Sequence, residues 1–206
     1  MSRSFLIFAS ALLALMAGAL LYAVRMPMQS PSPAPAPTPQ EIPQPRVLEV
    51  ISHPSFALPD VSGVERDFSE WDGKNRIVNF WATWCAPCRR EIPLLKAFQD
   101  QQGNNGFQVI GIAVDFPDAV ANYAEAAQFN YPVLVGEQDA MAIAESSGVE
   151  FIGLPFTMFV ASDGELLSTY IGELHQSHLD EIVEIMTRLD RAEISKDEAR
   201  TALDGF

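Results

Sequence analysis

Residues 79–88, which read NFWATWCAPC, constrain the fold more than any other stretch of this chain. The apolar run over residues 76–83 is typical of a strand that is buried on both faces, as central parallel strands are. Pro87 suits the first turn of a helix, and apolar residues recur after it at helical spacing. Cys85 and Cys88, the only cysteines in the sequence, are therefore expected where a central strand passes into a helix.

Strands and helices alternate along most of the remaining chain, which predicts an α/β domain with parallel strands. Pro93 is expected to kink the helix that follows the cysteines, and Gly103 to end it. Asp163-Gly164 is a strong hairpin signal. Ser177 is expected to begin the last clear helix, with Asp180 as its capping partner. Strands are predicted at residues 56–60, 64–68, 76–83, 107–114, 131–135, 156–161 and 166–171, and helices at 87–102, 117–129, 140–147 and 177–189.

The chain divides into four parts by composition. Residues 1–25 contain an uncharged run over 5–24, long enough to cross a bilayer, and form either a retained anchor or a cleaved export signal. The apolar run continues beyond the weak cleavage signal at residues 17–19, which favours a single transmembrane helix. Residues 26–45 are rich in proline and read as a tether. Residues 46–190 form one folded domain, and residues 191–206 a charged, peripheral tail.

The charge of the chain excludes some classes of partner. The formal net charge is −14, and from Arg46 onward eleven Lys and Arg stand against twenty-six Asp and Glu. So acidic a domain is an unfavourable partner for nucleic acid or for an anionic lipid surface.

Two cysteines spaced by two residues at a helix start admit several interpretations. A dithiol redox centre fits best, because the helix N-terminus stabilises the thiolate that attacks a disulfide, and Arg89 and Arg90 add positive charge. Cys85 would then attack, with its sulfur exposed at the helix tip, and Cys88 would resolve the mixed disulfide. A purely structural disulfide, a zinc site completed by His175 and His178, and two inert thiols are the alternatives.

The motif around the cysteines resembles that of the thioredoxin superfamily, and in particular the membrane-tethered, exported TlpA/ResA/CcmG (DsbE) group of thiol-disulfide oxidoreductases. The resemblance covers about residues 56–189, and a second motif, residues 153–157 (GLPFT), falls where the superfamily places its cis-proline loop. It implies a thioredoxin-like fold with N-terminal short strands and a central βα insertion, supplied by residues 107–135.

The resemblance also assigns the site. Cys85 and Cys88 would form the redox-active disulfide, and Pro155 would be the cis-proline that leaves a backbone edge open for substrate. Glu91 matches an acidic position near the disulfide and would relay protons for Cys88, since Asn79 stands where thioredoxin carries a buried aspartate. Trp84 is expected to border the sulfur and bind substrate.

Trp81 is expected in the core. Thr157 is expected to be structural, and His53, His175 and His178 to lie at the surface.

The function implied by the resemblance is disulfide exchange with protein substrates, without cofactor or metal. The chain would be a single-pass protein of a bacterial inner membrane with its domain in the periplasm. It would act as a reductant in cytochrome c maturation, with apocytochrome c as substrate and a transmembrane thiol reductase as electron donor. The sequence leaves open a general periplasmic reductase or isomerase, a reductant for copper delivery, and, from another class, a metal-binding module in which Cys85 and Cys88 hold the ion.

Overall fold

The computed structural model describes residues 53–148 and 150–205 of this chain. The predicted anchor (1–25) and tether (26–45) lie outside these residues, so their predictions stay untested. Among the helices that the structure does describe, none combines the length and the apolar character needed to cross a bilayer.

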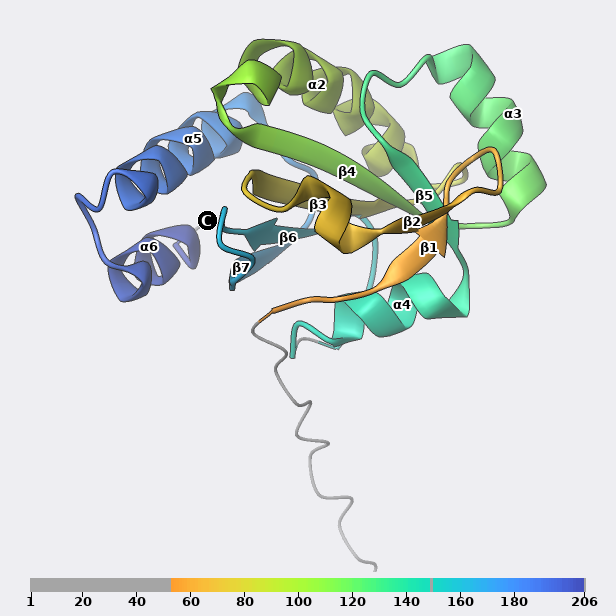
Figure 1. Cartoon of the computed structure of the whole chain (residues 1–206). Coiled ribbons are helices and arrows are strands. Elements are labelled where there is room, and N and C mark those ends of the chain that lie inside the picture. Colours follow the sequence, from red (N-terminus) through yellow and green to blue (C-terminus); the bar gives the residue numbers. More distant parts are fainter. Residues whose placement is uncertain (1–52, 149, 206) are drawn as a thin grey trace, which may run out of the picture. The chain divides into compact units, whose positions relative to one another are not determined.

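A five-stranded mixed sheet forms the centre of the domain, in the order β5-β4-β3-β6-β7 (Figure 1). The strand β3 pairs in parallel with β4 and β4 with β5, whereas β6 is antiparallel to both β3 and β7. The strands are β3 (Asn75–Trp81), β4 (Phe107–Val114), β5 (Val133–Gly136), β6 (Phe156–Val160) and β7 (Leu166–Ile171).

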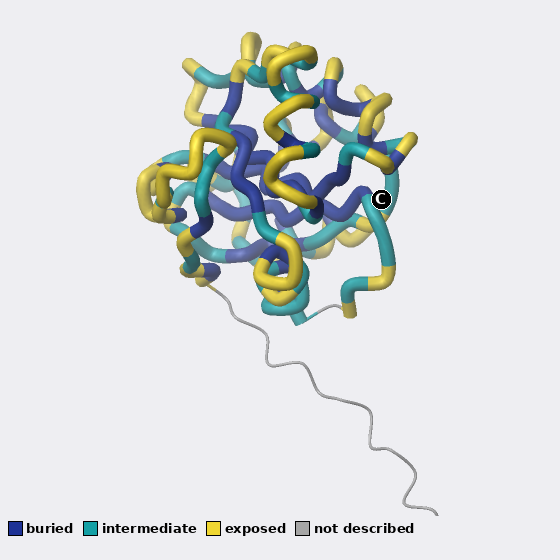
Figure 2. Tube along the Cα trace, turned by 90° about the vertical axis from the view of Figure 1, so that its right-hand side faces the viewer, coloured by how far each residue is buried: buried dark blue, intermediate teal, exposed yellow. Residues whose placement is uncertain are grey.

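Helices cover both faces of this sheet. One apolar cluster joins one sheet face to α2 (Ala86–Gln102), α3 (Pro117–Ala127), α5 (Gln176–Asp190) and α6 (Lys196–Leu203). The other joins the opposite face to α4 (Gln138–Glu145), the hairpin of β1 (Ala57–Pro59) and β2 (Glu65–Asp67), and the 3-10 helix η1 (Phe68–Trp71). A second 3-10 turn, η2 (Gly103–Asn105), follows α2. Figure 2 shows buried chain running through the interior of the domain, between exposed outer segments.

The central strand β3 decides which side chains meet α2. All its residues are buried, and because successive side chains of a strand point to opposite faces, Ile77, Asn79 and Trp81 share one face. Ile77 and Trp81 belong to the cluster that α2 covers, whereas Val78 and Phe80 belong to the other. Asn79 is thereby directed toward the helix that carries both cysteines.

The predicted thioredoxin-like α/β fold is confirmed, including the two short N-terminal strands and the elements β4, α3 and β5 in residues 107–135. The helix α2 continues through Pro93. The predicted start of α5 is wrong: the helix begins at Gln176, with His175 at its N-cap, instead of at Ser177 with Asp180 as capping partner. The N–H of His175 donates to Nδ1 of His178 at 3.2 Å, which occupies the capping role.

The prediction for the C-terminal tail is also wrong. The sequence predicts that residues 191–206 are peripheral, yet they contain α6, which is capped reciprocally by Ser195 and Glu198. Ala199 and Leu203 on one side of this helix are buried in the cluster shared with α2 and α5. The charged residues of the tail occupy only the outer side of an amphipathic helix, so the folded domain extends to the end of α6.

We predict that Leu203→Ala destabilises the protein, because Leu203 is only 1% exposed. Truncating a buried leucine removes apolar contacts and leaves a cavity, which costs about 2–5 kcal/mol. Urea unfolding of the full chain measures this loss, and Thr201→Ala on the exposed side of the same helix is the control, expected within about 0.5 kcal/mol of wild type. Equal stability of the two variants would contradict the packing of α6.

Candidate active site

Cys85 and Cys88 form a disulfide at the start of α2, with an S–S distance of 2.00 Å. Cys85 is the N-cap residue of the helix, and its Sγ accepts the backbone N–H of Cys88 at 3.3 Å. The backbone carbonyl of Cys85 in turn accepts the N–H of Arg89 at 3.1 Å. Because free N–H groups at a helix start favour negative charge, this sulfur occupies the position where a thiolate is most stabilised.

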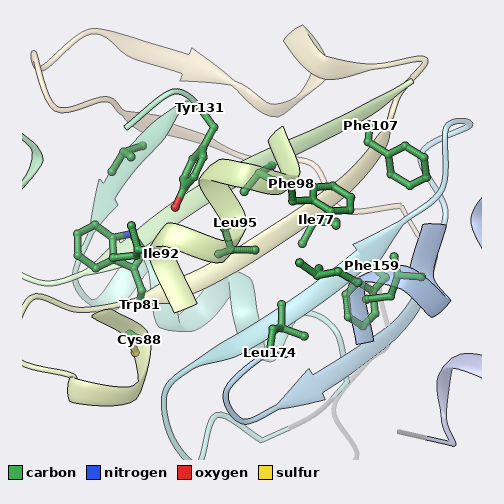
Figure 3. Packing of buried hydrophobic residues seen from close by; sticks show 14 of the residues in the cluster. Ile77, Trp81, Cys88, Ile92, Leu95, Phe98, Phe107, Tyr131, Phe159 and Leu174 are labelled. Carbon is green, nitrogen blue, oxygen red and sulfur yellow. The ribbon is translucent and has the colours of Figure 1, made fainter. Parts of the chain in front are cut away.

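The two cysteine residues are both buried, to slightly different degrees. Cys85 is 5% exposed and Cys88 is 0% exposed, so both residues are buried and only Cys85 has a small exposed surface. Cys85 is nevertheless less exposed than the sequence predicts, because it belongs to the apolar cluster under α2. Figure 3 shows Cys88 with Trp81, Ile92 and Leu95 among the side chains of that cluster.

The two tryptophans lie as expected, Trp81 in the core and Trp84 at the surface. Trp81 is buried and packs against Tyr123 and Phe129, with ring centroids 5.3 and 5.4 Å away. Trp84 is 68% exposed and directly precedes Cys85. An exposed indole beside the reacting sulfur offers a large apolar surface to a partner.

Glu91 is a buried carboxylate one helical turn after Cys88. It is 1% exposed, its Oε1 accepts the Asn79 amide at 2.9 Å, and its Oε2 accepts the N–H of Leu174 at 2.7 Å. Burial raises the pKa of Glu91 to about 7, although both hydrogen bonds act in the opposite direction. A carboxyl group with this pKa exchanges protons near neutral pH, as a relay requires.

Asn79 connects Glu91 to the neighbouring strand. Its Nδ2 also donates to Oγ1 of Thr157 at 3.1 Å, and the two residues are directly opposed in the β3–β6 ladder. Asn79 is an amide and cannot relay a proton as an aspartate could. Its Nδ2 instead donates a hydrogen bond to the carboxylate of Glu91, which comes from α2. Thr157 has the structural role that the sequence predicts.

The peptide bond between Leu154 and Pro155 is cis, as the second motif predicts. The carbonyl of Pro155 accepts the N–H of Gly172 at 2.9 Å. Ile152, in the same loop, is largely exposed, whereas Leu154 packs against the apolar clusters on both sides of the sheet.

Residues 172–174 tie the proline loop to α2, a connection that the sequence does not reveal. Besides the Gly172 and Leu174 bonds, Glu173 forms an ion pair with Arg90 at the surface, at 2.5 Å. Arg90, which the sequence assigns to the positive potential near the thiols, is thus largely engaged in this ion pair.

The described residues offer no cluster of metal-ligating side chains around Cys85 and Cys88. Among residues 53–148 and 150–205, no three or more His, Cys, Asp or Glu side chains gather in a way that could hold an ion. His175 and His178 contact each other at the start of α5, with ring centroids 5.4 Å apart.

Known proteins are similar to this chain in sequence and in fold. The model of the AhpC/TSA family matches residues 52–169, more than half of the chain. The thiol-disulfide oxidoreductase ResA of Geobacillus kaustophilus is 29% identical over 132 residues, which cover 64% of this chain and 74% of the relative. ResA of Bacillus thuringiensis subsp. konkukian is 28% identical over 135 residues, covering 65% and 76%.

A solved structure of a related protein has the same fold. A thiol:disulfide interchange protein of the thioredoxin family from Chlorobium tepidum superposes with a TM-score of 0.59 at 30% identity, over 67% of this chain and 97% of that one.

We predict that Glu91→Gln removes a pH dependence of stability. A carboxyl group whose pKa is raised from 4.5 to about 7 on folding stabilises the folded state at low pH, and this contribution is lost as the pH rises through 7. Between about pH 4 and pH 8, wild type should lose about 3 kcal/mol relative to Glu91→Gln.

Urea unfolding of the oxidised protein over this pH range measures the difference. The control is Glu125→Gln on the exposed side of α3, which removes the same charge without the burial. A constant difference between wild type and Glu91→Gln at every pH would contradict the raised pKa.

Proposed function

We propose that this chain, which belongs to the AhpC/TSA family and is a thiol-disulfide oxidoreductase of the ResA type, reduces disulfides of protein partners outside the cytoplasm. The observation that carries the exchange chemistry is the Cys85–Cys88 disulfide at the N-terminus of α2, where Cys85 Sγ accepts a helix N–H. The direction of electron flow and the partner rest on the resemblance to the TlpA/ResA/CcmG group, because Ala86 and Pro87 between the cysteines do not fix a redox potential.

The exchange takes place in two steps. In the reduced protein, the Cys85 thiolate attacks one sulfur of the partner's disulfide, which forms a mixed disulfide and releases the other partner sulfur as a thiolate. The Cys88 thiolate then attacks Cys85 Sγ, which releases the second partner sulfur. The Cys85–Cys88 disulfide is restored, and two electrons have passed to the partner, to be replaced by an external thiol reductant.

Glu91 supplies the proton acceptor that the second step needs. Cys88 is fully buried, so its proton has little access to solvent, and Glu91 is the carboxylate one helical turn away. With a pKa of about 7, Glu91 accepts a proton from a thiol near neutral pH and returns it afterwards.

The proposed setting is the periplasmic side of a bacterial inner membrane. The uncharged run over residues 5–24 supports an anchor, and the proline-rich residues 26–45 support a tether that lets the domain reach its partners. We propose apocytochrome c as the substrate in cytochrome c maturation, and a transmembrane thiol reductase as the electron donor. A general periplasmic reductase or isomerase, a reductant for copper delivery and a metal-binding module compete with this assignment.

We predict that Cys88→Ser, expressed in the native host, accumulates covalent complexes through Cys85. The variant completes the first step and lacks the thiol that resolves it. Non-reducing electrophoresis followed by mass spectrometry identifies the trapped partners. Apocytochrome c among them supports the narrow assignment, and a broad set of exported proteins supports the general reductase.

Cys85→Ser is the matched control, which should trap nothing because the attacking thiol is missing. Reduction of insulin by wild type and the metal content of the reduced protein are measured in parallel. An absence of trapped protein with Cys88→Ser contradicts exchange, and stoichiometric metal without insulin reduction favours the metal-binding module.

A further inference from the structure

The carboxylate of Asp115, directly after β4, joins two turns at the edge of the sheet where the disulfide lies. Its Oδ2 accepts the backbone N–H of Thr83 at 2.9 Å and the Thr83 hydroxyl at 2.6 Å. Its Oδ1 accepts the N–H of Phe116 at 2.8 Å. We infer that Asp115 is a positioning residue for disulfide exchange, which holds the turn that presents Trp84 and Cys85. The inference rests on the exchange reaction proposed above and adds a residue to it.

The register of the sheet brings these residues together. Trp81 of β3 is paired with Ala113 of β4, so the parallel strands end side by side, and Thr83 and Asp115 each lie two residues beyond this pair. Parallel strands bring their carboxyl ends to one edge, where functional groups of α/β proteins gather. The turn between β3 and α2 is short, and only Trp84 separates Thr83 from Cys85. A displacement of Thr83 therefore displaces the reacting sulfur.

Asp115 is suited to hold a backbone in place. It is only 8% exposed, and hydrogen bonds to a carboxylate are shorter and stronger than those between neutral groups. Two of its three bonds go to Thr83, so both the backbone and the side chain of that residue are fixed. A geometry held in advance is what an attacking group needs, since a misplacement of about 1 Å can cost about 100-fold in rate.

The carboxylate of Asp115 is bonded to Thr83, two residues before Cys85. A nearby anion disfavours a second anion, so Asp115 opposes the thiolate, whereas the helix start and Arg89 favour it. Charged or titratable groups also follow Cys85 on α2 (Arg90, Glu91), stand in the segment bonded to that helix (Glu173, His175) and lie in the first turn of α3 (Asp118).

The test replaces Asp115 in the full chain and follows the reduction of insulin with dithiothreitol as electron source. The Asp115→Asn variant keeps the size of the side chain but loses the charge and one acceptor. We expect kcat/KM to fall about tenfold, because the turn is no longer held. The pKa of the Cys85 thiol, measured from the pH profile of alkylation, should also fall. A role in stability alone would leave this pH profile unchanged.

Matched variants separate positioning from general damage. Asp67→Asn is the control, because Asp67 likewise accepts the N–H and hydroxyl of one residue, Ser69, at 2.8 and 2.6 Å, in the turn before η1. It should leave kcat/KM and the alkylation profile as in wild type. Thr83→Val, which lacks the hydroxyl donor, should lower kcat/KM, and Thr83→Ser should restore it.

Unchanged kcat/KM and alkylation profile in Asp115→Asn overturn the inference, even if the melting temperature falls. If Asp115→Asn does not fold, Thr83→Val decides instead: reduced kcat/KM supports the positioning role, and wild-type kcat/KM overturns it. A wild-type protein that fails to reduce insulin contradicts the proposed function itself, and is thereby distinguishable from failure of this inference.

Discussion

The sulfur of Cys85 caps the helix whose N-terminus activates it, and the site depends on this double role. The bond from the Cys88 N–H to Cys85 Sγ exists because β3 ends at Trp81 and α2 begins at Ala86, with the cysteine at the N-cap. An N-cap residue accepts a backbone N–H that would otherwise lack a partner. The hydrogen bond that caps the helix is therefore also one that would stabilise a Cys85 thiolate in the reduced protein, so a change in the turn between β3 and α2 would affect both.

The second constraint is the buried carboxylate of Glu91. It is bonded to Asn79 on β3 and to the backbone of Leu174, in the same segment whose Gly172 holds the carbonyl of Pro155. One ionisable group thus joins the cysteine helix, the central strand and the segment behind the proline loop. Burying this carboxyl group costs stability near neutral pH, and strongly perturbed pKa values of this kind gather at functional sites.

The sequence predicts the parts of the site that lie close together in the chain, and misses those that folding brings together. Cys85, Cys88 and Pro155 are evident from short motifs, and the strand-to-helix pattern places the cysteines. The hydrogen bond between Leu174 and Glu91 joins residues that are 83 positions apart in the sequence, and the one between Thr83 and Asp115 spans 32 positions. A local sequence pattern cannot predict such contacts. The helix α6 was missed although its Ser195-x-x-Glu198 capping signal is present, because the charge of the tail concealed its apolar side.

The most direct test of the account is the order in which the two thiols of the reduced protein react. Alkylation with limiting iodoacetamide over a range of pH, followed by peptide mass spectrometry, gives the rate and the pKa of each cysteine. We predict that Cys85 reacts first, with a pKa below the ordinary thiol value of about 8.5, and that Cys88 reacts much more slowly. Preferential modification of Cys88, or a Cys85 pKa at or above that value, would contradict it.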